Sequence, residues 1–299
     1  MTTSYSRLVT TAAIAATLVA GLLIIAKLIA WFYTGSASML ASLTDSFLDI
    51  SASLINLMAI RYALVPPDED HRFGHGKAES LAGLAQSAFI SGSAVFLIIN
   101  GIARLLNAEP VTHAATGIWV MVLSLGLTLL LITFQQYVIR RTQSLAIKAD
   151  QLHYRGDILL NLAVLLAIVL SWYGWYWADG LFAILIGAHI LYGALKIGYD
   201  SAQMLLDRRL PDEEQKRIME CCLAVKGVRG LHDLRTRRSG RTRFIQLHLE
   251  LDDQLPLVRA HVIADTAERE LRRLFPDADI IIHMDPVSVV PFETRLESE

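Results

Sequence analysis

Four ionisable residues fall into two pairs with the same spacing. Asp45 and Asp49 form the first pair, and His153 and Asp157 form the second. Residues at i and i+4 share one face of a helix, so each pair would present two ligand atoms side by side. Two carboxylates this close repel each other, and they coexist best with a cation or a proton between them. Three carboxylates and one imidazole form a tetrahedral ligand set that suits Zn²⁺.

A second group of metal-type residues lies in the polar segment PPDEDHRFGHGKAES. Asp68, His71 and His75 are spaced closely enough to close on one ion, because neutral imidazoles and carboxylates are common ligands of divalent metals. Glu69 and Asp70 are spare candidates. The alternative is a polar turn that is simply solvated.

A third group is spread over the last seventy residues of the chain. Alternation along 243–251 places His248 on the polar face of a predicted strand, and His283 and Asp285 share one face of a later strand by the same rule. Any one of these histidines alone fits an ordinary surface position. Together they could converge on a two-ion site bridged by a carboxylate, and the full set is His232, His248, His261, His283 and Asp285.

Long apolar segments must position the two pairs, Asp45 with Asp49 and His153 with Asp157. The chain is 54% hydrophobic and only 19% charged, and the apolar excess lies before about residue 206. A membrane-spanning helix needs about 20 mostly apolar residues. Six segments meet that length, and we predict six transmembrane helices at roughly 8–33, 37–63, 81–105, 115–138, 147–177 and 180–205.

Basic residues predict the orientation of these helices. An even number of spans puts both termini on one side, and that side carries most of the arginines and lysines near span ends. The opposite side has only Arg104 near a span end, together with Lys27, which can snorkel. Both termini and the C-terminal domain are therefore expected in the cytoplasm.

Charges inside a span are expensive and usually mark an ion or proton pathway. The alternative is structural: Asp45 or Asp49 could be a buried partner of Lys27 or Arg155, and His153 could face the headgroups. The apolar part of span five begins only at residue 158. The two pairs therefore meet only if this helix starts earlier, near residue 145, and we expect that it does.

A soluble pattern replaces the apolar one after Pro211. A helix at 212–225, strands at 230–238 and 243–251, a helix at 256–274 and a strand at 279–285 predict an α-β-β-α-β domain, an open sheet with helices on one face. The fold class is thus an α-helical membrane protein with a C-terminal α+β domain. We divide the chain into 1–207 (transmembrane), 208–290 (cytoplasmic, metal-binding and dimerising) and 291–299 (tail). The adjacent Cys221 and Cys222 are expected to be reduced core thiols.

These motifs together resemble the cation diffusion facilitator family, in particular its bacterial zinc and iron efflux type. The resemblance covers essentially the whole chain, and it is carried by the segments SLTDSFLDI, HRFGHGKAES, KADQLHYRGDILLN, LLDRRLPDEE and IIIHMDP. It implies a homodimer with a transport site, a loop site and a metallochaperone-like cytoplasmic domain that binds two ions. By position it also implies an inter-subunit charge lock between Lys77 and Asp207, and an apolar gate at Leu152.

The expected function is a proton-coupled antiporter that exports divalent cations by alternating access. Zn²⁺ is the expected cargo and regulatory ion, with Cd²⁺ and Fe²⁺ as further cargo, and His153 and Asp157 are the expected proton carriers. No nucleotide-binding motif is present in the sequence, and no nucleic-acid partner is expected. The expected location is a bacterial inner membrane. A non-transporting metal sensor is the alternative; an intramembrane metalloprotease would need a motif such as H-E-x-x-H, which the sequence lacks.

Overall fold

The computed structural model describes residues 2–34, 37–106, 118–173, 175 and 177–290 of the chain. The chain divides into two compact units, Met1–Ala202 and Gln203–Glu299. The predicted tail, 291–299, lies outside the described residues, as does the start of the fourth predicted span.

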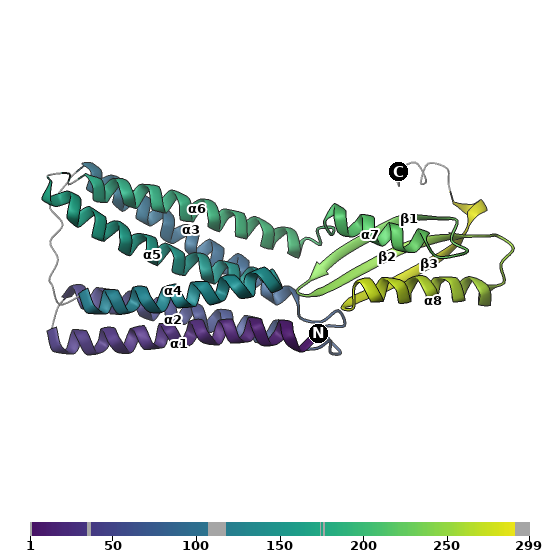
Figure 1. Cartoon of the computed structure of the whole chain (residues 1–299), viewed down its shortest axis with the longest axis horizontal. Helices are drawn as coiled ribbons and strands as arrows, with labels where there is room; N and C mark the ends of the chain where they lie inside the picture. The colour runs from purple at the N-terminus through teal and green to yellow at the C-terminus, as the bar shows by residue number, and fades with distance from the viewer. Residues whose placement is uncertain (1, 35–36, 107–117, 174, 176, 291–299) are drawn as a thin grey trace. The chain divides into compact units, whose positions relative to one another are not determined.

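Six long helices make up the described part of the first unit (Figure 1). The fifth begins at Leu145, as required to bring His153 and Asp157 into a helix, and it ends at Trp172, earlier than expected. The other boundaries agree with the predicted spans to within a few residues. The helices are α1 (Thr2–Thr34), α2 (Ala37–Ala63), α3 (Lys77–Leu106), α4 (Ile118–Thr142), α5 (Leu145–Trp172) and α6 (Ala178–Leu205).

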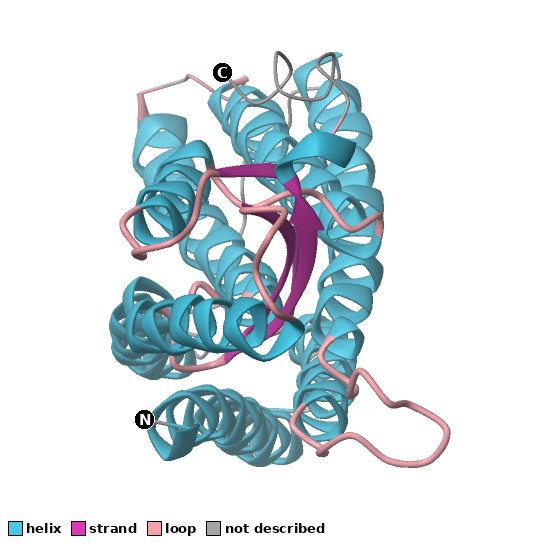
Figure 2. Ribbon diagram, turned by 90° about the vertical axis from the view of Figure 1, so that its right-hand side faces the viewer, coloured by secondary structure: helices cyan, strands magenta, loops and turns pink. Residues whose placement is uncertain are grey.

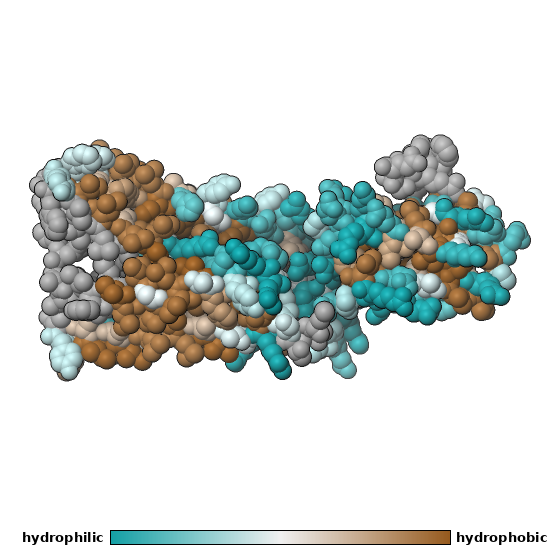
Figure 3. Space-filling model, in the orientation of Figure 1, coloured by the Kyte–Doolittle hydropathy of each residue, from teal (hydrophilic) through white to brown (hydrophobic). Residues whose placement is uncertain are grey.

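The first unit is a helical transmembrane domain. Among the described residues, α1, α3, α4 and α6 are long and apolar enough to cross a membrane by composition. The other two, α2 and α5, carry the paired ionisable residues, and with 27 and 28 residues they are also long enough to span a hydrocarbon core of about 30 Å. Figure 3 shows a broad hydrophobic surface on this unit, with polar residues gathered towards one end.

Helix α5 is held in place by a buried carboxylate. Asp150 is 1% exposed, and it accepts hydrogen bonds from Gln86 Nε2 on α3 (3.4 Å) and Gln135 Nε2 on α4 (2.7 Å). Tyr154, also buried, shares a hydrogen bond of 3.0 Å with Ser53 on α2. Since buried polar groups need partners, these bonds fix the rotation of α5 and with it the direction of His153.

The pair α3 and α6 approach each other closely at small residues. A Cβ atom added to Gly180 would lie 2.6 Å from the backbone nitrogen of Leu105, so only glycine fits there. Such close approach is typical of helices that pack within a membrane.

The second unit contains a three-stranded sheet covered by helices on one face. Its elements are α7 (Asp212–Leu223), β1 (Gly230–Ser239), β2 (Thr242–Leu251), α8 (Leu257–Leu274), β3 (Ala278–Pro286) and a short 3₁₀ turn at Val287–Val289. The strand order is β1-β2-β3, with β1 antiparallel and β3 parallel to β2 (strands in magenta in Figure 2). The parallel pair requires a crossover, which α8 provides. This confirms the predicted α-β-β-α-β order.

The core of this unit follows from alternation along the strands. Ile245, Leu247 and Leu249 are buried, and they pack in one cluster with residues of both α7 and α8. Both helices therefore cover the same face of the sheet, as predicted. Cys222 belongs to this core, and burial raises the pKa of its thiol to about 12, so it stays a neutral thiol. Cys221 and Cys222 are not bonded to each other.

Candidate metal sites

Three of the four predicted transport ligands converge in the first unit. Asp49 from α2 meets His153 and Asp157 from α5, and one ligand atom of each lies within 4.8 Å of the others. His153 Nε2 is 2.9 Å from Asp49 Oδ1 and 4.0 Å from Asp157 Oδ2. All three side chains are partly buried, so a bound cation would be only partly hydrated.

Asp45 lies in α2 one helical turn before Asp49, as the i, i+4 spacing requires. Its side chain is outside the described residues, so its place in the ligand set stays a prediction. The early start of α5 puts His153 and Asp157 one turn apart on the same helix. The geometry therefore brings Asp49 of the first pair together with both members of the second pair.

A cavity of about 740 Å³ opens at this cluster. Besides Asp49, His153 and Asp157 it is lined by Asn100 and Arg104, near the C-terminal end of α3, and by residues in the N-terminal halves of α4 and α6. These positions lie towards the helix ends opposite the chain's N-terminus. The cavity therefore leads from the cluster towards the side of the membrane domain opposite the N-terminus.

Leu152, the predicted gate residue, directly precedes His153 in α5 and packs against α3 and α6. It contacts a buried apolar group formed by α3 and α6, whose members are Ile90, Ala94, Ile190 and Ala194. Gly193 faces Leu152 so closely that a Cβ atom there would lie 3.0 Å from its methyl carbons. Leu152 is not among the cavity-lining residues.

The loop residues Asp68, His71 and His75 also come together. His75 Nε2 and His71 Nδ1 each lie 3.3 Å from a different oxygen of Asp68. The backbone N–H of His71 donates a hydrogen bond of 2.6 Å to Asp68 Oδ1, and this bond holds the pKa of the Asp68 carboxyl below its usual value. His75 is buried, and its Nδ1 lies 3.3 Å from the carbonyl oxygen of Val65, which leaves Nε2 available to a metal.

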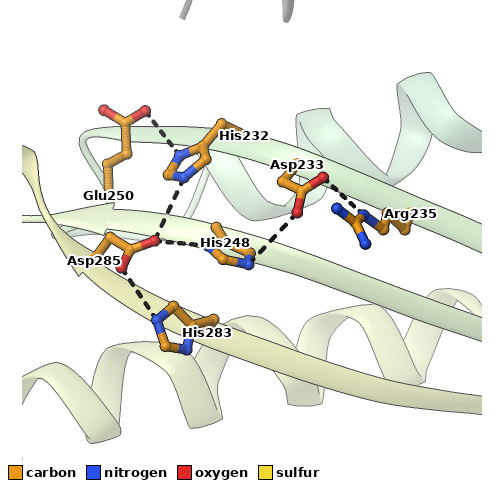
Figure 4. A network of polar contacts seen from close by, with 7 residues as sticks. All are labelled: His232, Asp233, Arg235, His248, Glu250, His283 and Asp285. Atoms are coloured by element: carbon orange, nitrogen blue, oxygen red, sulfur yellow. Dashed lines mark hydrogen bonds and ion pairs between the residues drawn. The ribbon is translucent and has the colours of Figure 1, made fainter. Parts of the chain in front are cut away.

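The third cluster lies on the sheet face that α7 and α8 leave uncovered (Figure 4). Asp285 is its centre: its Oδ2 lies 2.7 Å from His248 Nδ1 and 3.4 Å from His232 Nε2, and its Oδ1 lies 3.2 Å from His283 Nε2. The register of the sheet explains this meeting, because β2 pairs His248 with His232 on one side and with His283 on the other. A carboxylate with histidines on both oxygens is suited to bridge two ions.

Two further carboxylates in this cluster were not predicted from the sequence. Glu250 Oε1 lies 3.2 Å from His232 Nδ1, and Asp233 Oδ2 lies 3.8 Å from His248 Nε2. Each therefore faces the ring nitrogen turned away from Asp285. Glu250 lies two residues after His248 and so shares its face of β2, where it is only 5% exposed. Asp233 sits at the bulge in β1 with φ of 47°, and a bulge cannot be read from the local pattern.

His261 does not join the cluster within the described part of one chain. It lies exposed on α8, and α8 packs on the opposite face of the sheet from His248. The predicted charge lock also remains a prediction: Lys77 belongs to the first unit and Asp207 to the second. Within the second unit, Asp207 Oδ1 lies 3.3 Å from Arg237 Nη1.

Comparison with known proteins identifies the class that combines these features. Residues 13–206 match the cation efflux transmembrane domain, and residues 210–287 match the cation efflux protein cytoplasmic domain. The chain belongs to the cation efflux family, the cation diffusion facilitators. It is a multi-pass membrane transporter with a cytoplasmic C-terminal domain, and it is not an enzyme.

The relatives similar to this chain include the cation-efflux pump FieF of two enterobacteria. The protein of Klebsiella pneumoniae is 58% identical over 291 residues, which cover 97% of each chain. The protein of Escherichia coli O139:H28 is 57% identical over 295 residues, which cover 99% of this chain and 98% of the relative. A solved structure of CzrB in its Zn form is 33% identical over 28% of this chain and 98% of its own, with a TM-score of 0.26.

Proposed function

We propose that this protein is a homodimeric, proton-coupled antiporter that exports divalent cations from a bacterial cytoplasm across the inner membrane. Zn²⁺ is the main cargo, and Cd²⁺ and Fe²⁺ are further cargo. The observation that carries the proposal is the convergence of Asp49, His153 and Asp157 within 4.8 Å at the end of a cavity inside the membrane domain. The relatives that match over nearly the whole chain are named cation-efflux pumps.

Proton exchange at this cluster supplies the coupling. Carboxylates and imidazole bind metal only when they are deprotonated, so a proton and the cation compete for the same atoms. His153 and Asp157 carry the protons, because His153 contacts both carboxylates through its Nε2 atom. A proton on that nitrogen blocks metal binding and pairs with the carboxylates instead.

The energetics favour coupling over simple diffusion. Moving a divalent cation outward against an inside-negative potential costs roughly 4.6 kcal/mol per 100 mV, twice the figure for one charge. Inward movement of protons returns part of this charge. The outward-leading cavity and the packed Leu152 correspond to the state that releases the cation, with Leu152 as the gate on the cytoplasmic side.

The cytoplasmic cluster fits a resident zinc site. His232 Nε2, His248 Nδ1 and Asp285 present nitrogen and oxygen donors, which Zn²⁺ accepts in tetrahedral sites. His283 is placed to take a second ion through the other oxygen of Asp285. The bound metal would cross-link β1, β2 and β3 and stabilise the domain. The loop cluster of Asp68, His71 and His75 would hold a further ion at the end of α2.

A second copy of the chain completes the metal site of the cytoplasmic domain. His261 is exposed on α8 beside the exposed apolar residues Leu257, Val258 and Val262. An apolar patch around a metal-type residue is suited to burial against another subunit. His261 therefore acts as a ligand to the partner's ions, and the charge lock of Lys77 with Asp207 forms across the same dimer.

Zinc flux into proteoliposomes distinguishes a transporter from a metal sensor. With the purified protein and an imposed pH gradient, we expect flux that increases with the gradient. Asp49→Ala should abolish the flux while circular dichroism shows unchanged helicity. Flux that ignores the gradient would contradict the proton coupling, and no flux from the wild-type protein would leave only the sensor function.

A further inference from the structure

The cavity that leads away from the cluster of Asp49, His153 and Asp157 is also lined by a lysine. Lys27 lines it from α1, together with Asp49 and His153. The position of Lys27 near the end of a predicted span suggested a side chain that snorkels to the membrane surface. The structure instead directs it inward, so its ammonium group shares the space through which the cation must pass.

Lys27 is held close to the ligand-bearing stretch of α2. Its Nζ donates a hydrogen bond of 2.6 Å to Ser46 Oγ, and Ser46 is only 2% exposed. Ser46 precedes Asp49 by three residues, which is slightly less than one helical turn. The ammonium therefore lies about one turn from a predicted metal ligand, on a flexible four-carbon stem that can move further.

The positive charge of Lys27 affects the site differently when it is empty and when it holds a metal ion. The carboxylates of Asp49 and Asp157 repel each other when no metal is bound, and a nearby positive charge relieves this repulsion. When the metal is bound, the same positive charge repels the metal. A carrier needs binding that is strong enough to load the ion and weak enough to release it.

We propose that Lys27 is an internal counter-cation of the transport site, which replaces the departing metal ion and so speeds its release on the outer side. The inference rests on the proposed function of Asp49, His153 and Asp157 as the transport site. It adds a residue that shapes the rate of the cycle without binding the metal. Lys27 acts in the outward-leading state, where the cavity joins it to the cluster.

The test is zinc flux by full-length Lys27→Met in proteoliposomes. Removing the charge should lower both the KM for zinc and the maximal rate by about tenfold, because a unit charge one turn away changes binding by that order. Lys27→Arg should retain wild-type values. The matched control is Lys196→Met, because Lys196 is exposed on α6 and does not line the cavity, and it should leave both values unchanged.

Equilibrium zinc binding to the detergent-solubilised protein provides the second measurement. Lys27→Met and the smaller polar change Lys27→Gln should both tighten binding at the transport site. Unchanged affinity and rate, or weaker binding by a folded variant, would overturn the inference. If the wild type shows no flux, the proposed transport function fails, whereas the change in affinity still decides the role of Lys27.

Discussion

The membrane cluster and the cytoplasmic cluster use the same residue types but hold them differently. In the membrane, His153 meets two carboxylates through one nitrogen, beside an open cavity. On the sheet, His232 and His248 each have a carboxylate at both ring nitrogens. Outer partners fix the orientation of metal-binding histidines and raise metal affinity. We infer that the first cluster is built to exchange its ion and the second to retain it.

The largest effect on zinc flux is expected from removing His153, whose Nε2 faces both Asp49 and Asp157 in the membrane cluster. His153→Ala should lower zinc flux by at least about 100-fold, since even losses of outer partners cost 10–100-fold at metal sites. The cytoplasmic cluster should still bind zinc, which isothermal titration calorimetry of the same variant would show. If flux persists, or if zinc binding disappears altogether, the two clusters are not independent sites with separate roles.

A smaller effect is expected from the outer carboxylates of the sheet cluster. Glu250→Gln and Asp233→Asn keep the side-chain shape but remove the negative charge that faces His232 and His248, so zinc affinity should fall about tenfold. Flux should change less than affinity. The matched control is Glu214→Gln, because Glu214 pairs with Arg243 rather than with a histidine of the cluster. An equal loss in the control would mean that the domain is merely destabilised.

The contrast between the clusters also shows what the sequence could and could not predict. The i, i+4 pairs can be read from local spacing, and the start of α5 near residue 145 follows from the requirement that the two pairs meet. The structure brings Asp49, His153 and Asp157 together. Glu250 and Asp233 could not be assigned in this way. Their roles depend on strand register and on a bulge between His232 and Arg235, which long-range pairing decides. Likewise, the inward direction of Lys27 depends on how α1 packs against α2.

The smallest effect is expected at the loop cluster, in the pH dependence of stability. The hydrogen bond from the His71 N–H lowers the pKa of Asp68 in the folded protein. The ionised Asp68 carboxylate therefore stabilises the folded protein fully above the unfolded pKa of about 4. This stabilisation is lost as the pH falls through the lower folded pKa. Asp68→Asn should lower the unfolding temperature slightly at pH 7, and the difference from wild type should shrink as the pH falls below the unfolded pKa of about 4. A difference that stays constant over this range would contradict the assignment.

Zinc release from each cluster tests the difference between exchange and retention most directly. Stopped-flow chelation would follow the loss of zinc from Asp285→Ala, in which the membrane cluster remains, and from His153→Ala, in which the sheet cluster remains. We predict that the membrane cluster releases zinc at least about tenfold faster, because its histidine is less restrained, and that its release speeds up as the pH falls. Equal release rates from the two clusters, or slower release from the membrane cluster, would contradict this account.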